Sequence, residues 1–129
     1  MAKMVIFSEV QGKVVHNGVP VPDAVIEREF RWSWKDEVGN DVARTDQMGE
    51  FKLGRIERSS LLGSVLPHEP NIEQTILIKV GGKTYKGWMF RKRDYKLNGE
   101  LDGKPIVMTC RLESEPAHTG KVFGICELK

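Results

Sequence analysis

Residues 24–34 read Ala-Val-Ile-Glu-Arg-Glu-Phe-Arg-Trp-Ser-Trp, a stretch in which apolar and charged side chains alternate. Successive side chains of a β-strand point to opposite faces of the sheet. The alternation therefore predicts a half-buried strand, with Phe30 and Trp32 in the core and Glu29 in solvent. Only Arg28 interrupts the apolar face.

A charged loop and a sharp turn are expected on the C-terminal side of this strand. Trp34 borders the hairpin loop Lys35–Asp41, so we expect its ring to be partly exposed. Residues 45–51 then read Thr-Asp-Gln-Met-Gly-Glu-Phe. Asp46 can accept hydrogen bonds from downstream backbone amides, and Gly49 tolerates a positive φ. A new strand is therefore expected to start directly after Gly49.

Other turn sequences indicate further short strands. Asn17-Gly18 and Gly81-Gly82 are dipeptides that favour two-residue hairpin turns. Pro20 and Pro22 lack backbone donors, so the segment that contains them is expected to be an edge strand or a connector. The remaining expected strands cover residues 10–16, 72–80, 83–90, 105–113 and 121–128, and one short helix is expected near Ser59–Leu66.

The length and the strand pattern together predict one all-β domain. The chain has 129 residues, which is the size of a single domain with one core. Short strands separated by turn sequences are typical of a sandwich or barrel. We expect residues 1–129 to form a single, mainly antiparallel β-sandwich with at most one short helix.

The charge balance and hydropathy limit the classes of partner. Twenty Lys and Arg against 18 Asp and Glu leave a formal net charge of +2, which does not favour nucleic acid. No apolar run approaches the roughly 18 residues of a membrane span, and the first residues do not resemble a signal peptide. We therefore expect a cytoplasmic protein that binds no membrane, or a periplasmic one if its two cysteines prove oxidised.

Three separated elements carry a resemblance to a known family. They are Gly12-Lys13-Val14, the segment Pro20-Val21-Pro22-Asp23-Ala24, and Thr45-Asp46-Gln47-Met48-Gly49-Glu50-Phe51. In this order the elements resemble the carboxypeptidase regulatory-like domains of the transthyretin-like superfamily. The resemblance implies a Greek-key sandwich of about seven strands. The whole chain also resembles an uncharacterised group of small bacterial single-domain proteins with this core.

Cys110 and Cys126 are expected to face each other. Cys110 shares its parity with the apolar residues Met108 and Leu112, so it should point into the core. If the last two strands pair antiparallel about His118, Cys110 lies directly opposite Cys126. Opposed Cα atoms lie about 4.5–5.5 Å apart, within reach of a disulfide. We predict this proximity and leave the oxidation state open.

The sequence lacks the patterns of common catalytic and metal sites. His16, His68 and His118 are dispersed and have no ligand-like spacing, so surface or hydrogen-bonded roles are expected. We expect no metal, no cofactor and no catalysis. The superfamily also contains transthyretin-related hydrolases, which remain an alternative although the chain lacks their Tyr-Arg-Gly-Ser-type tail.

The candidate partner-binding residues form two groups, and both favour a protein partner. A rim aromatic beside a charged loop is typical of an interface anchor, and three adjacent cations suit an acidic protein. The partner could be a toxin, for an immunity or inhibitor role, or a component of a secretion system. The alternative is a carbohydrate-binding module that uses Trp32, Trp34 and Trp88. The candidate partner-binding residues are Trp34, Lys35, Asp36 and Glu37 in one group, and Arg91, Lys92, Arg93 and Tyr95 in the other.

Overall fold

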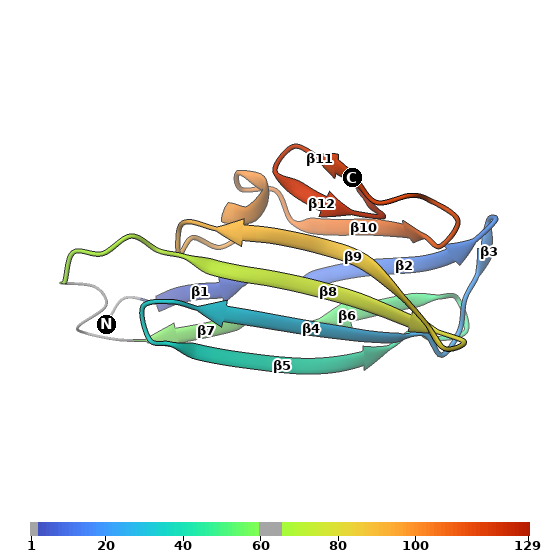
Figure 1. Cartoon of the computed structure of the whole chain (residues 1–129), viewed down its shortest axis with the longest axis horizontal. Helices are drawn as coiled ribbons and strands as arrows, with labels where there is room; N and C mark the ends of the chain where they lie inside the picture. Colours follow the sequence, from blue (N-terminus) through green and yellow to red (C-terminus); the bar gives the residue numbers. More distant parts are fainter. Residues whose placement is uncertain (1–2, 60–65) are drawn as a thin grey trace.

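The computed structural model describes residues 3–59 and 66–129, and it places them in two packed layers of β-strands (Figure 1). The expected all-β sandwich is confirmed. Within the described residues, the only helical element is the 3-10 turn η1 (Gly99–Leu101), and no helix could cross a membrane. The strands are β1 (Lys3–Phe7), β2 (Val10–His16), β3 (Val19–Pro20), β4 (Val25–Trp32), β5 (Glu37–Arg44), β6 (Glu50–Leu53), β7 (Ile56–Ser59), β8 (Ile72–Val80), β9 (Lys83–Lys92), β10 (Ile106–Arg111), β11 (Ala117–Thr119), β12 (Val122–Gly124) and β13 (Cys126–Leu128).

The strands of the two layers alternate along the chain in short groups. One layer has the order β13-β10-β2-β3, and β6 pairs with β2 beside β3. A two-stranded sheet of β1 and β7 extends this layer, as Figure 1 shows. The other layer has the order β11-β12-β9-β8-β4-β5. Among the described strands, every pair is antiparallel except β2 with β10. The described residues contain thirteen strands. If β1 is counted with β2, and β6 with β7, and the short strands β3 and β11–β13 are left out, seven strands remain.

The hairpin turns lie where the turn sequences predicted them. Asn17 and Gly18 have φ values of 50° and 83°, and Gly81 and Gly82 have values of 55° and 79°. Positive φ at both central residues is the conformation of the tight hairpin turn. Pro20 lies in the two-residue edge strand β3, where its missing amide leaves no gap inside the sheet.

The Asp46 turn connects the two layers. The Asp46 carboxylate accepts hydrogen bonds from the backbone amides of Met48 and Glu50, each at 2.9 Å. Gly49 has a φ of +76°, and a Cβ at this position would lie 2.5 Å from the carbonyl oxygen of Val14. The turn therefore requires both residues, as the sequence predicted, and it delivers the chain into β6.

The charged loop after β4 is shorter than expected. The sequence predicted a loop over Lys35–Asp41, but the turn occupies residues 33–36 and β5 already begins at Glu37. Asp41 pairs with the buried Arg28 across the two strands, with oxygen and nitrogen atoms 2.6 Å apart. Charged residues are therefore accommodated within β5, because cross-strand partners neutralise them.

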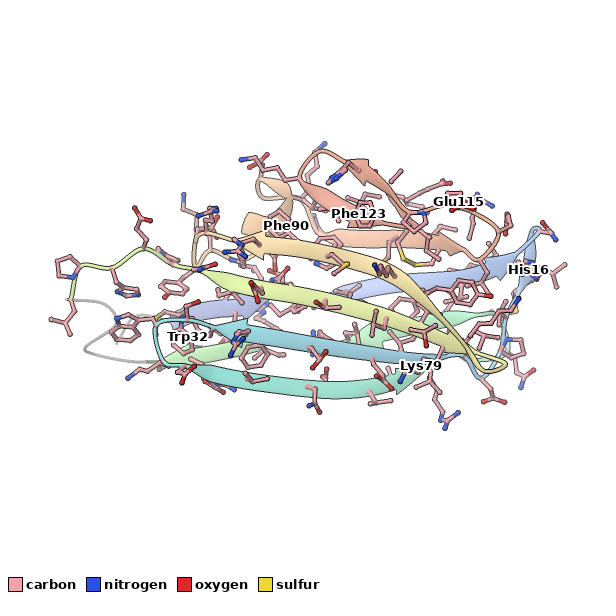
Figure 2. The ribbon with its side chains drawn as sticks, in the orientation of Figure 1. His16, Trp32, Lys79, Phe90, Glu115 and Phe123 are labelled. Atoms are coloured by element: carbon pink, nitrogen blue, oxygen red, sulfur yellow. A yellow bond between two sulfur atoms is a disulfide. The ribbon has the colours of Figure 1, made fainter. Side chains whose placement is uncertain are left out.

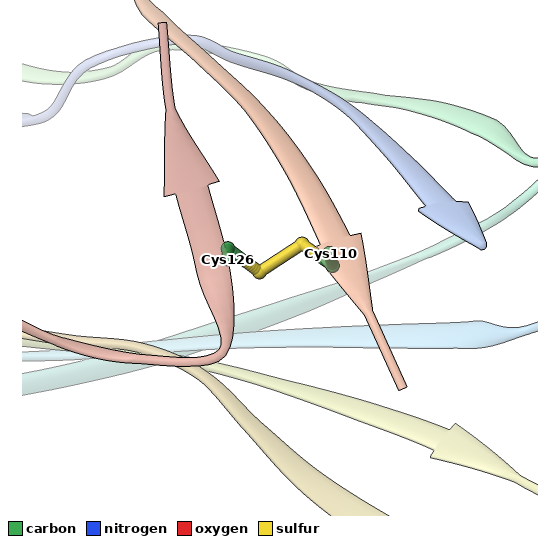
Figure 3. Close-up of a disulfide and its surroundings, with 2 residues drawn as sticks. All are labelled: Cys110 and Cys126. Carbon is green, nitrogen blue, oxygen red and sulfur yellow. A yellow bond between two sulfur atoms is a disulfide. The ribbon is translucent and has the colours of Figure 1, made fainter. Parts of the chain in front are cut away.

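The final strand is divided between the two layers. The sequence predicted one strand over residues 121–128, but β12 pairs with β9 and β11, while β13 pairs with β10. Gly124 allows this crossing, because a Cβ there would overlap the carbonyl of Gly87. Beyond the crossing, Cys110 lies opposite Cys126, and the two form a disulfide with Cα atoms 4.0 Å apart (Figure 3). The predicted proximity is confirmed.

Other expectations concern the core and one helix. Phe30 and Trp32 are buried, as their parity predicted, and Cys110 is completely buried. Ser59 is the last residue of β7. Leu66, the other end of the expected helix, lies in a bend, and residues 60–65 between the two lie outside the described residues.

Candidate functional site

Several candidate residues gather at one end of the sandwich, which we call the loop end. It consists of the β4–β5 turn at residues 33–36, the segment 66–71 before β8, and the loop at residues 93–105 after β9 (Figure 1). The backbone amide of Ser33 donates to the carbonyl of Asn71 at 3.1 Å, which joins the first two segments. Figure 2 shows Trp32 at this end and His16 at the opposite end.

Four aromatic side chains form a connected group at the loop end, which we call the aromatic cluster: Trp32, Trp34, His68 and Tyr95. The rings of Trp34 and His68 are stacked, with centroids 4.3 Å apart and planes inclined by 13°. The ring of Tyr95 meets Trp32 edge-on at 6.0 Å. The cluster thereby links Trp34 and Tyr95, which are distant in sequence and belong to the two predicted groups.

A chain of hydrogen bonds fixes the orientation of the cluster. The indole N–H of Trp32 donates to the Tyr95 hydroxyl at 2.9 Å, and that hydroxyl lies 2.7 Å from Nε2 of His68. The other ring nitrogen, Nδ1, lies 2.9 Å from the carbonyl oxygen of Leu66. Because a carbonyl only accepts, Nδ1 carries a proton, and in the neutral imidazole Nε2 then accepts from the Tyr95 hydroxyl. His68 therefore has a hydrogen-bonded role, as the sequence analysis expected.

The Tyr95 hydroxyl remains the proton donor of this chain at neutral pH. Burial raises the pKa of Tyr95 above its ordinary value, and the hydrogen bond from Trp32 opposes this shift. The protonated hydroxyl can therefore accept from Trp32 and donate to His68 at the same time. Trp32 is the buried member of the cluster, and Trp34, His68 and Tyr95 are half-buried.

The predicted residues next to Trp34 lie around a neighbouring hollow. The ammonium group of Lys35 lies 4.6 Å from the centroid of the Trp34 ring, a cation–π contact. Lys35, Asp36 and Glu37 line a hollow of about 380 Å³. Glu37 binds Arg58 with a closest oxygen to nitrogen distance of 2.6 Å, and this hydrogen bond raises the pKa of Arg58.

The three adjacent cations at the C-terminal end of β9, Arg91, Lys92 and Arg93, do not form one patch. Arg91 and Arg93 are exposed, but Lys92 between them is completely buried, because β9 continues to this residue and its side chains alternate. The Lys92 ammonium binds the Asp94 carboxylate at 2.7 Å and the Lys96 carbonyl at 2.7 Å. Lys92 therefore stabilises the loop, and its proposed role in partner binding is wrong.

The two exposed arginines line the same groove but differ in their partners. Arg91 forms an ion pair with Glu73 at 2.8 Å, and no ion pair to a described residue is found for Arg93. The groove has a volume of about 700 Å³, and we call it the basic groove after its cations Arg91, Arg93, Lys104, Lys121 and Lys129. The three lysines were not predicted as site residues. No local pattern marks them, because each is a single lysine in a different loop or strand end.

The three tryptophans do not form an open sugar platform. The expected alternative used Trp32, Trp34 and Trp88, but Trp32 is 1% exposed and Trp88 is 0% exposed. The indole N–H of Trp88 donates to Gln74 inside the core at 3.1 Å. Only Trp34 retains exposed surface, so the arrangement lacks the face on which a sugar ring would stack.

The three histidines do not gather into one site in the described part of the chain. His16 and His118 are exposed on β2 and β11, away from His68. Residues 3–59 and 66–129 contain no group of three or more His, Cys, Asp or Glu that could hold a metal ion.

These features define an all-β sandwich domain with an ordered aromatic cluster and a cationic groove at its loop end. Residues 10–115 match the family described as a domain of unknown function (DUF6795), and the chain belongs to this family. No curated protein and no solved structure matches the chain.

Proposed function

We propose that this domain is a non-catalytic protein-interaction module whose partner docks on the loop end. The observation that carries the proposal is the fixed, half-buried ring of Trp34. It stacks on His68, which is held in turn by Tyr95 and Trp32. An aromatic side chain that is ordered before binding costs little conformational entropy when a partner covers it.

The surroundings of Trp34 support a protein partner. Lys35 lies over the ring, and Asp36 and Glu37 line the neighbouring hollow, so both signs of charge adjoin Trp34 in the manner of the polar rim of an interface. The three segments of the loop end are mostly irregular and rest on a rigid sandwich, an arrangement typical of binding surfaces. A role as an immunity protein or inhibitor of a toxin, or as a secretion-system accessory, fits this arrangement. The resemblance to carboxypeptidase regulatory-like domains is compatible with it.

The disulfide bears on the compartment in which the domain acts. Disulfides persist in oxidising compartments and are rare in a reducing cytosol. The Cys110–Cys126 bond therefore supports an oxidising compartment, such as a periplasm, over the cytoplasm. Alkylation of free thiols under denaturing conditions, directly after acid quenching of source cells, followed by mass spectrometry tests this: both cysteines should remain unlabelled, and labelled cysteines would contradict it.

The proposal is tested by affinity capture from the source cell with three versions of the domain. The wild type should capture a defined partner. The Trp34→Ala variant should bind that partner at least about tenfold more weakly, because truncating an interface anchor typically costs more than about 1.4 kcal/mol. His16→Ala, an exposed substitution at the opposite end, serves as the matched control and should retain it. Equal capture by all three versions would contradict docking on the loop end.

A further inference from the structure

The basic groove is a hollow formed by four segments that are far apart in sequence. Its walls come from the end of β9, the η1 region, the turn between β11 and β12, and the end of β13. Phe90, Leu101 and Leu128 contribute half-buried apolar side chains to it. The groove therefore has apolar surface inside and cations around it.

Three cations of the groove lack acidic partners within the described residues. Arg91, which also lines the groove, is paired with Glu73. Ion pairs are also formed by Arg28, Arg55, Arg58, Lys79, Lys92 and Arg111. In contrast, no ion pair to a described residue is found for Arg93, Lys104 or Lys121. These three side chains are exposed, and all three line the groove.

The acids of the groove do not neutralise it. The Asp94 carboxylate is bound by Lys92 at 2.7 Å. Glu100 is only 6% exposed, and its oxygens accept hydrogen bonds from Ser8 and Gln74. Asp102 is the one exposed acid of the groove without an ion pair to a described residue. The groove therefore concentrates positive charge, although the whole chain carries only +2.

We propose that the basic groove binds an acidic segment of a polypeptide that also carries apolar side chains. The carboxylates would meet Arg93, Lys104 and Lys121, while the apolar side chains would contact Phe90 and Leu101. Charge complementarity favours an anionic partner and steers its approach. The apolar interior favours a polypeptide over nucleic acid, whose binding depends mainly on many phosphate contacts and therefore on a larger basic surface. This inference rests on the proposed function, because it names the chemistry of the protein partner.

The direct test uses a fluorescein-labelled peptide of about twelve residues, in which leucines are spaced among aspartates and glutamates. Fluorescence anisotropy should show saturable binding that weakens as salt increases. The double variant Lys104→Glu/Lys121→Glu should bind the peptide at least about tenfold more weakly. Lys52→Glu/Lys83→Glu makes the same change in net charge at exposed residues outside the groove and should bind within about twofold of the wild type.

Three further probes separate the possible sources of affinity. A peptide with glycine in place of each leucine should bind more weakly than the leucine-containing acidic peptide. A single-stranded DNA of similar length should also bind more weakly than that peptide. In NMR spectra of the wild type, the backbone amide chemical shifts of Phe90 and Leu101 should change when the peptide is added. Any of four results would overturn the inference. They are undetectable binding of the acidic peptide, equal losses of affinity in the two double variants, tighter binding of the DNA than of the peptide, and equal affinities for the leucine and glycine peptides.

The test also separates this inference from the proposed function. Trp34→Ala should leave the affinity for the acidic peptide unchanged, because Trp34 does not line the groove. If the peptide fails to bind while partner capture still depends on Trp34, only the acidic chemistry of the groove is wrong. If the peptide binds and Trp34→Ala captures its partner normally, the groove stands and the role of Trp34 is wrong.

Discussion

Reduction of the Cys110–Cys126 disulfide should lower the stability of the sandwich by an amount that its position determines. The bond closes a loop with a sequence separation of 16 residues, which contains β11 and β12. The chain-entropy relation gives about 3 kcal/mol for a loop of this length. With about 2.1 cal/mol/K of unfolding entropy per residue, the 129 residues correspond to a decrease in melting temperature of about 11 °C.

Thermal unfolding followed by circular dichroism measures this decrease. The oxidised protein is compared with the same protein in excess reductant, which removes the bond without removing a sulfur atom from the core. The variant Cys110→Ala/Cys126→Ala is the control, and reductant should not change its melting temperature. Melting temperatures of the oxidised and reduced wild type within about 2 °C would refute the argument that the bond constrains the unfolded chain.

Two further predictions concern the Asp46 turn and the buried pair at the end of β9. Asp46→Ala removes the acceptor of two amide hydrogen bonds and should lower the free energy of unfolding, measured by chemical denaturation, by about 1–2 kcal/mol. Gly49→Val should lower it by about 3 kcal/mol, because the added Cβ meets the Val14 carbonyl. Unchanged stability in both variants would show that the turn is not required. Burial raises the pKa of Asp94, but the hydrogen bond from Lys92 and other favourable contacts outweigh this, so its pKa lies below the ordinary value. Asp94→Asn should therefore reduce the free energy of unfolding by a constant amount from pH 7 to about pH 4, and the difference should disappear as acid protonates the wild-type carboxylate. A difference that persists unchanged at pH 2.5 would contradict the pairing.

Local chemistry made much of this fold predictable. The turns at Asn17-Gly18 and at Asp46 depend on residues within the turn itself, so a short window of sequence is sufficient. The burial of Trp32 follows from the parity of a single strand. Parity placed Cys110 in the core, and an antiparallel register centred on His118 placed it opposite Cys126, although β11 and β12 between the two cysteines belong to the other layer.

The remaining features depend on contacts between distant segments. The division of the last strand requires Gly124 to approach Gly87, and nothing in either local sequence shows that these glycines meet. From the sequence, Lys92 resembles an exposed cation. In the structure β9 extends to Lys92, and the Asp94 carboxylate binds its ammonium group. Charged residues with partners can occupy positions that a simple alternation of apolar and polar residues assigns to apolar side chains.

The candidate site was likewise only partly predictable from the sequence. Trp34 and the charged residues after it were recognised because they adjoin each other in the sequence. The stacking of Trp34 on His68 and the convergence of Lys104 and Lys121 on one groove arise only when the loops are brought together at one end of the sandwich. Single lysines in separate loops carry no signal of a shared surface.

The central claim is that the loop end is the surface to which a protein partner binds. The most direct measurement is a map of amide chemical shift changes in the isotope-labelled domain as the captured partner is added. The largest changes should lie at residues 33–37, around His68, and along the basic groove. Changes confined to the opposite end, around His16 and the β8–β9 turn, would contradict the claim.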